Sequence, residues 1–177
     1  MLRKQTNAFA MHYGLIFGLI WCISLLFLVS DNTSLRTFSS PLFLLTPFIG
    51  FYIGYLFKIK VQYNGDVSYL RGLSFSLLLY LYATAVLAFA AYLYFQFFDH
   101  GAFARQNLEV LSQPEVQAIF KSQKMIDSGI TIKELQTAIK SITPMTVTAA
   151  IININVLLSI PLALITAFFT ITKKKTN

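Results

Sequence analysis

Four long runs of the sequence contain no Asp, Glu, Lys or Arg, and this feature limits the fold more than any other. The runs cover residues 8–30, 39–57, 73–98 and 145–172. About 20 helical residues cross the roughly 30 Å hydrocarbon layer of a bilayer, so uncharged runs of this length are typical of membrane spans. Only 12% of the chain is charged, against about 25% in soluble domains. The sequence therefore predicts a membrane protein with four spans.

The spans are expected to be helices. Backbone in contact with lipid must satisfy its hydrogen bonds within the protein, which leaves helices and closed β-barrels. A barrel would need alternating apolar and polar residues in each strand, whereas these runs are apolar throughout. The first run is too long for the apolar part of a signal peptide. We therefore predict an all-α membrane protein with four transmembrane helices, forming one integral membrane domain over residues 1–177.

The distribution of charge predicts the orientation. The N-terminus, residues 58–72 and the C-terminal Lys-Lys-Lys segment hold eight basic residues and one acidic residue, whereas residues 31–38 and 99–144 hold six of each. The positive-inside rule therefore places both termini in the cytoplasm and residues 99–144 outside it, as a helical insertion between the third and fourth spans. Basic residues in three small groups beside the membrane suit anionic lipid, and we expect a bilayer and no nucleic acid as partner.

The connection between the second and third spans, KIKVQYNGDVSYL, has two interpretations. Asn64 and Gly65 between alternating apolar and polar residues are typical of a β-hairpin. Alternatively, the second span continues as a helix, Asn64-Gly65 ends it in the left-handed conformation, and Ser68 caps the next helix. An isolated hairpin is only marginally stable, so we favour the helical alternative. Asp66 and Arg71 are single charges near this cytoplasmic turn and are expected to be solvated.

The segment YNGDVSYLRGLSFSLLLYLYATAVLAFAAYLYFQFFDHGAF carries a family resemblance. It contains, in order, Asn64-Gly65, Ser68-Tyr69, Gly72 and an aromatic end at Phe97-Phe98-Asp99. In these features the chain resembles the four-span inner-membrane family of Bacteroidota catalogued as domain-of-unknown-function 4199. The resemblance would extend over nearly the whole chain and implies a location in a bacterial inner membrane. It implies no activity and no functional residues.

Residues 99–144 are predicted to form two amphipathic helices. Ser112 to Glu115 and Thr131 to Glu134 have the spacing of a capping box, in which a hydroxyl and an acid satisfy each other's backbone N–H groups. Helices are therefore expected near 113–127 and 131–142. Their apolar faces could pack within the protein, lie on the outer leaflet or bind a partner, and packing within the protein is the simplest alternative.

Small residues recur at four-residue intervals in the first two spans. The positions are Ala10, Gly14, Gly18 and Cys22 in the first span, and Gly50 and Gly54 in the second. Glycines at this spacing let two helices approach closely in lipid. They are expected to pack helices within one bundle, and the alternative is an interface between copies of the chain.

The fourth span carries the clearest polar pattern, and Thr143-Pro144 is expected to begin it. At 100° per residue, four polar residues lie within about 40° of one another. They are Thr148, Asn155, Ser159 and Thr166. This stripe could line a polar path or form hydrogen bonds between helices. Asn153 points away from Ser159, and it could satisfy polar groups near the kink expected at Pro161.

The sequence favours a protein without catalytic activity. Chemistry within the bilayer usually needs ionisable groups there, and His12 and His100 fall at opposite ends of predicted spans. We therefore predict no cofactor, no metal site and no enzyme. The favoured function is a structural, assembly or accessory subunit that packs with itself or with another envelope membrane protein. The alternative is a small oligomeric channel or transporter lined by the stripe of the fourth span.

Overall fold

The computed structural model describes residues 2–30, 32–62, 67–120 and 131–172, and all regular structure in them is helical. The chain divides into two compact units. The first unit contains residues 1–91 and 149–177, and the second unit contains residues 92–148. The helices α4 and α9 contribute to both units. An all-helical protein is therefore confirmed for the described residues.

Three helices are long and apolar enough to cross a membrane. They are α1 (Leu2–Leu28), α4 (Tyr69–Phe97) and α9 (Pro144–Thr170). A fourth candidate span is the pair of α2 (Thr33–Leu44) and α3 (Thr46–Gln62), which is bent by 41°. The described residues thus contain three candidate spans, or four if the bent pair is one span, as expected for a multi-pass membrane protein.

The prediction of one continuous helix over residues 39–57 is wrong. The helix begins earlier, at Thr33, where the side chain of Asn32 accepts a hydrogen bond from Ser34 N at 2.9 Å. It then breaks at Leu45. The reason is Pro47, which has no N–H for the carbonyl of Phe43 and whose ring would collide with that carbonyl in a regular helix.

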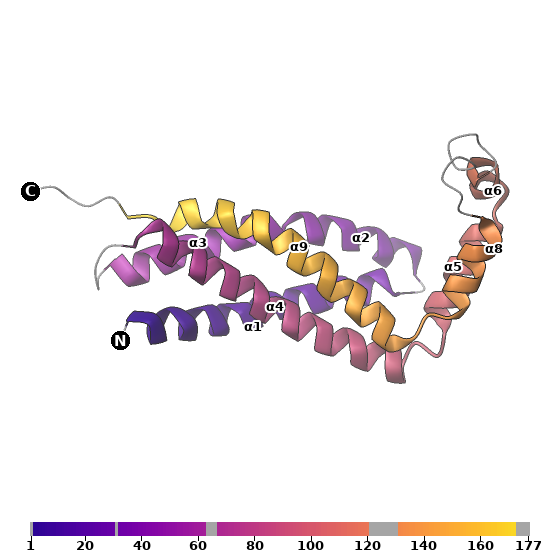
Figure 1. Ribbon diagram of the computed structural model, residues 1–177, viewed down its shortest axis with the longest axis horizontal. Helices are drawn as coiled ribbons and strands as arrows, with labels where there is room; N and C mark the ends of the chain where they lie inside the picture. Colours follow the sequence, from indigo (N-terminus) through magenta and orange to yellow (C-terminus); the bar gives the residue numbers. More distant parts are fainter. Residues whose placement is uncertain (1, 31, 63–66, 121–130, 173–177) are drawn as a thin grey trace, which may run out of the picture. The chain divides into compact units, whose positions relative to one another are not determined.

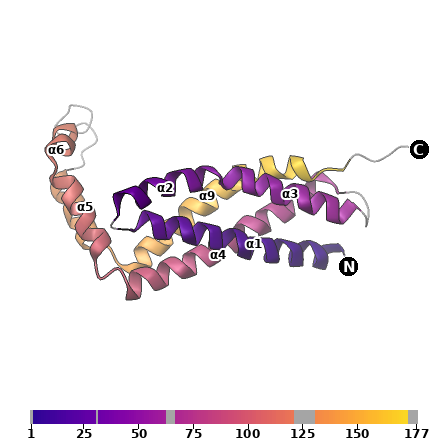
Figure 2. The ribbon, with the colours of Figure 1, turned by 180° about the vertical axis from the view of Figure 1, so that it is seen from behind.

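The helices of the first unit run side by side (Figures 1 and 2). The start of α1, the end of α3, the start of α4 and the end of α9 lie at one end of this unit, which we call the terminal end. Contacts there join distant parts of the chain. Arg71 Nε donates to Thr6 Oγ1 at 3.3 Å, and Val67 N donates to Thr172 Oγ1 at 2.7 Å.

The hairpin interpretation of the turn after α3 is wrong, and the helical one is confirmed where the structure describes it. The helix α3 continues to Gln62, and α4 begins at Tyr69. Ser68 caps α4, because its Oγ accepts from Arg71 N at 3.4 Å and its carbonyl accepts from Gly72 N at 3.0 Å. Asn64 and Gly65 lie outside the described residues.

The second unit contains α5 (Ala102–Ser112), α6 (Pro114–Phe120) and α8 (Ile132–Lys140). The capping box at the start of α8 is confirmed. Thr131 Oγ1 accepts from Glu134 N at 3.3 Å, and the Glu134 carboxylate accepts from Thr131 N at 2.9 Å. The hydrogen bond from this backbone N–H, together with one from the Thr131 side chain, lowers the pKa of Glu134. Both bonds favour the charged carboxylate.

The second predicted capping box, at Ser112, is wrong. Ser112 is the last residue of α5, and its hydroxyl donates to Glu109 O at 2.6 Å. The helix α5 was not predicted. It begins after Gly101, whose backbone is in the left-handed conformation (φ 78°). The predicted helix 113–127 is described as far as Phe120. α5 packs against α8 within the unit, so these two helices cover each other.

Candidate functional site

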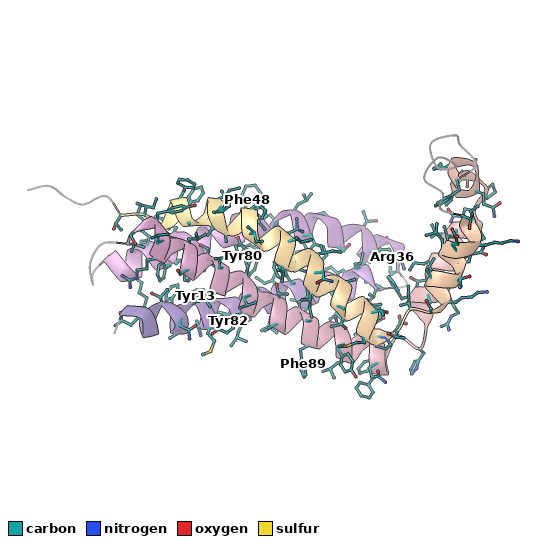
Figure 3. The ribbon with its side chains drawn as sticks, in the orientation of Figure 1. Tyr13, Arg36, Phe48, Tyr80, Tyr82 and Phe89 are labelled. Carbon is teal, nitrogen blue, oxygen red and sulfur yellow. The ribbon has the colours of Figure 1, made fainter. Side chains whose placement is uncertain are left out.

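The centre of the first unit is a junction of three helices around Tyr80. The side chain of Tyr80, from α4, is fully buried, and its hydroxyl lies 3.0 Å from Thr166 Oγ1 of α9. The third helix, α3, contributes Gly50, whose missing side chain leaves the space that the Tyr80 hydroxyl occupies. Figure 3 labels Tyr80 among the helices. Two neutral hydroxyl groups therefore satisfy each other in the core.

Glycines bring α9 close to its neighbours at this junction. A Cβ atom at Gly54 of α3 would lie 3.0 Å from Thr166 Cγ2 and 3.4 Å from Thr170 Cγ2. A Cβ atom at Gly72 of α4 would overlap with Thr170 Oγ1. Gly50 and Gly54 therefore lie in contacts within the chain.

The break between α2 and α3 is tied into the same core. Trp21 Nε1 donates to Thr46 Oγ1 at 3.1 Å, beside the break at Leu45. The ring of Phe17 lies 4.9 Å from the ring of Trp21 and 5.8 Å from that of Tyr80, measured between centroids. The aromatic core thus runs from the break to the Tyr80 junction.

The small-residue face of α1 lies against α4. A Cβ atom at Gly14 would lie 2.6 Å from Tyr82 Cβ, and one at Gly18 would lie 2.7 Å from Val86 Cβ. Ala10 on the same face is fully buried. Cys22 Sγ lies 4.0 Å from the carbonyl oxygen of Val86. This face is occupied by the chain itself.

The four residues of the predicted stripe on α9 do not have a common environment. Thr166 bonds to Tyr80 on another helix. The others bond to carbonyl oxygens of their own helix: Thr148 to Pro144, Asn155 to Ile151 and Ser159 to Val156. Thr148 also belongs to the second unit, whereas the other three belong to the first. In the first unit, therefore, the stripe provides one hydrogen bond between helices.

Asn153 and Pro161 are both exposed. The helix α9 continues through Pro161 to Thr170. The side chain of Asn153 makes no hydrogen bond to any described residue. In particular, it makes none near Leu157, whose carbonyl loses its usual helical donor because Pro161 has no N–H. Asn153 therefore presents an unsatisfied amide on the surface of an apolar helix.

The middle of α9 is the least covered part of the candidate spans. From residue 149 to residue 162, which we call the open stretch, no side chain is buried. Leu157 and Leu158 within it are 68% and 56% exposed. Burial resumes at Ala163, Thr166 and Ala167. The open stretch is a long helix face that the first unit offers for contact with lipid or with another protein.

The described residues offer little for catalysis or metal binding. No three His, Cys, Asp or Glu side chains among them come together as a metal site. The described part of the first unit contains no Asp or Glu. Its internal polar groups include hydroxyls and the Trp21 indole, which are suited to hydrogen bonding between helices, and the guanidinium of Arg71.

The sequence of the chain matches one protein family. The family described as Protein of unknown function (DUF4199) matches residues 12–171, which is most of the chain. The chain belongs to this family. The predicted resemblance is thereby confirmed for DUF4199. The match covers the second unit and all the candidate spans except the start of the first, which begins at Gln5. No curated protein and no solved structure gives a significant match.

Sequence reasoning missed three residues of the first unit that carry polar contacts. Tyr80 and Trp21 are aromatic residues with a polar group in the middle of apolar runs, and this could have identified them as hydrogen-bonding positions. Arg71 was expected to be solvated, and that expectation is wrong. It is half-buried, with Nη2 fully buried and without a hydrogen-bond partner.

Proposed function

We propose that this protein is a non-catalytic structural or assembly subunit of a bacterial inner membrane, and that it associates with a second copy of itself through the open stretch of α9. The observation that carries the proposal is the unsatisfied amide of Asn153 within that stretch. An enzymatic role has no support among the described residues, whose polar groups in the first unit are neutral or basic.

The depth of Asn153 supports an intermolecular contact. The midpoint of α9 is residue 157, halfway between Pro144 and Thr170. Asn153 is four residues from it, or about 6 Å along the helix axis. The hydrocarbon layer extends about 15 Å on either side of its own midplane, so the amide would lie well inside it. Lipid tails offer no hydrogen bond, and an unsatisfied amide there is unfavourable.

A second copy is the partner that fits this amide best. An asparagine side chain both donates and accepts, so two Asn153 residues related by a twofold axis can pair. Leu157 and Ile160 lie on the same face of the helix and would pack around the pair. Both are at least half exposed, at 68% and 50%. Gly14 and Gly18 of α1 already pack against α4 of the same chain, and this favours α9 over α1 as the interface between copies.

Replacing Asn153 with leucine is expected to weaken self-association by about 3- to 20-fold, since hydrogen bonds between helices in lipid are worth about 0.6 to 1.7 kcal/mol. Energy transfer between labelled copies in liposomes, measured across a range of protein-to-lipid ratios, gives the dissociation constant. The matched control is Phe89→Leu on α4, which is 67% exposed and labelled in Figure 3.

Cysteine crosslinking locates the same interface. In a Cys22→Ser background, Asn153→Cys should form disulfide-linked dimers in membranes, and Phe89→Cys should not. Unchanged association of Asn153→Leu, together with equal crosslinking at both positions, would contradict the proposal.

The alternative function is a small oligomeric channel or transporter lined by the stripe of α9. The half-buried Asn155 and Ser159 are the residues that would line it. This is the weaker proposal, because Asn155 Nδ2 and Ser159 Oγ already donate to carbonyl oxygens of their own helix. Loss of solute flux in Asn155→Leu with self-association unchanged would favour transport. Loss of association would favour a role in packing.

We also propose that both termini lie in the cytoplasm, on the basis of the basic residues near the terminal end of the first unit. A membrane-impermeant maleimide should then label Ser112→Cys in intact spheroplasts. Lys58→Cys should be labelled only after the membranes are opened. Both variants carry Cys22→Ser. Labelling in the opposite order would show the inverted orientation.

A further inference from the structure

Arg71, at the terminal end of the first unit, is a partly buried cation without an acidic partner among the described residues. Its Nε donates to Thr6 Oγ1 at 3.3 Å, but its Nη2 is buried and has no hydrogen-bond partner. Leaving a buried charged donor unpaired costs more than leaving a neutral one. A guanidinium group in this state is suited to an acceptor that the described chain does not supply.

Aromatic rings hold two cations at this place. The Arg71 guanidinium lies over Phe57, with Cζ 6.0 Å from the ring centroid, and Lys60 Nζ lies 5.7 Å from the centroid of Phe9. The two rings are neighbours, with centroids 5.5 Å apart. Ring faces attract cations but accept no conventional hydrogen bonds. The rings therefore position the two cations, but they provide neither a negative charge nor a hydrogen-bond acceptor.

The described residues of the first unit provide no carboxylate to neutralise these cations. The two acidic residues of the unit, Asp31 and Asp66, lie outside the described residues. Thr6 adds a neutral hydroxyl beside the guanidinium. The local balance of charge thus favours an external anion.

The position along the helices indicates where that anion comes from. The candidate spans begin at Gln5 and Tyr69, and the α2–α3 pair ends at Lys60. Thr6, Lys60 and Arg71 are therefore all within two residues of the end of a candidate span. Phospholipid phosphates lie at this depth, just outside the hydrocarbon layer.

We propose that Arg71, Lys60 and Thr6 form a binding site for the phosphate group of an anionic phospholipid. The guanidinium supplies a permanent positive charge and N–H donors that Thr6 does not use, and phosphate oxygens are suitable acceptors for them. Lys60 supplies the second positive charge. The site does not depend on self-association through α9.

Lipid retention tests the site directly. The purified full-length protein is placed in nanodiscs that contain phosphatidylglycerol and phosphatidylcholine with the same acyl chains, and native mass spectrometry counts the lipids that remain bound. The wild type should prefer phosphatidylglycerol. Arg71→Ala should reduce that preference by about tenfold or more, as expected for the loss of charged hydrogen bonds. Lys60→Ala should have a smaller effect in the same direction.

Matched variants make the test specific. Lys58→Ala removes a charge from the same segment of α3. Lys58 is half-buried and makes no ring contact among the described residues, so this change should leave the preference within about twofold, as for an isolated charge without a specific partner. Arg71→Lys keeps the charge and loses the planar fork, so it should fall between the wild type and Arg71→Ala. If Arg71→Ala does not fold, as judged by thermal unfolding in phosphatidylcholine, Arg71→Lys and Lys60→Ala still test the site.

Competition with inorganic phosphate identifies the source of the anion, and two results would contradict the proposed site. Excess inorganic phosphate should displace little phosphatidylglycerol if the lipid is the ligand, and full displacement would overturn the lipid assignment. Equal retention by the wild type and Arg71→Ala would overturn the site. So would a preference that appears only in Asp66→Asn, because Asp66 would then be the natural partner of Arg71. The Asn153→Leu variant should retain lipid as the wild type does, which separates this result from the test of self-association.

Discussion

Leucine in place of Gly18 is expected to lower the free energy of unfolding of the first unit by about 2 to 3 kcal/mol, the upper part of the roughly 1 to 3 kcal/mol typical of overpacking a filled core. A Cβ atom at Gly18 would lie 2.7 Å from Val86 Cβ and 2.9 Å from the carbonyl oxygen of Ala83. The second atom belongs to the backbone of α4, so no side-chain rotation relieves the overlap. The two helices would have to move apart.

Trp21 makes this experiment practical. It is the single tryptophan of the chain, it is buried, and it donates a hydrogen bond to Thr46. Its fluorescence should therefore report unfolding in mixed micelles as the fraction of denaturing detergent rises. Leu19→Ala is the control, because Leu19 is adjacent and 58% exposed; its change should stay within about 0.5 kcal/mol. Equal stability of Gly18→Leu and the wild type would show that α1 does not pack on α4 through this face.

Truncating Tyr80 to alanine is expected to cost about 3 to 5 kcal/mol, the range for removing a large aromatic side chain from a core. The ring is fully buried and contacts Phe17, and the hydroxyl fills the space beside Gly50. Tyr80→Phe removes only the hydroxyl and should cost about 0.6 to 1.7 kcal/mol, as for a hydrogen bond between helices in lipid. The difference between the two variants separates packing from hydrogen bonding.

A double-mutant cycle tests the pairing of Tyr80 with Thr166. Tyr80→Phe, Thr166→Val and the double variant are compared by the same fluorescence measurement. A coupling energy of about 0.6 kcal/mol or more is expected if the hydroxyls bond to each other. Strictly additive effects would show that each hydroxyl has another partner. Phe89→Ala, on the exposed face of α4, is the control for losing an aromatic ring (Figure 3).

Several features of the fold were predictable because they depend on local chemistry. The absence of charge over some 20 residues indicates a spanning helix whatever its neighbours are, and α1, α4 and α9 match three predicted spans to within a few residues at most of their ends. Thr131 with Glu134 and Thr143 with Pro144 mark helix starts through bonds within one turn. Thr143 Oγ1 accepts from Thr146 N at 3.2 Å, and α9 begins at Pro144 as predicted.

Other features were missed although the sequence contained a signal. Pro47 indicates a helix break within the preceding turn, but a search for uncharged runs treats Pro47 as one more uncharged position. The helix α5 mixes apolar and polar residues, and its N-cap residue Gly101 has no side chain to cap it. Its first turn is instead capped from Asp99, whose Oδ1 accepts from Phe103 N at 3.0 Å, so it has neither signature used for the other helices. Ser112 was assigned to the wrong helix end because the same spacing to Glu115 also arises by chance.

The sequence by itself determined the membrane class of this protein, its helical fold and the positions of most helix ends, since these follow from the transfer of apolar side chains into lipid and from bonds within one turn. Only the tertiary structure decided which faces are occupied. It places Gly18 against α4 and Tyr80 against Thr166, buries Arg71 Nη2 and leaves Asn153 uncovered. The physical reason is that an apolar helix is compatible with lipid on every side. Its pattern therefore does not reveal the packed face, which depends on shape complementarity between residues far apart in the chain.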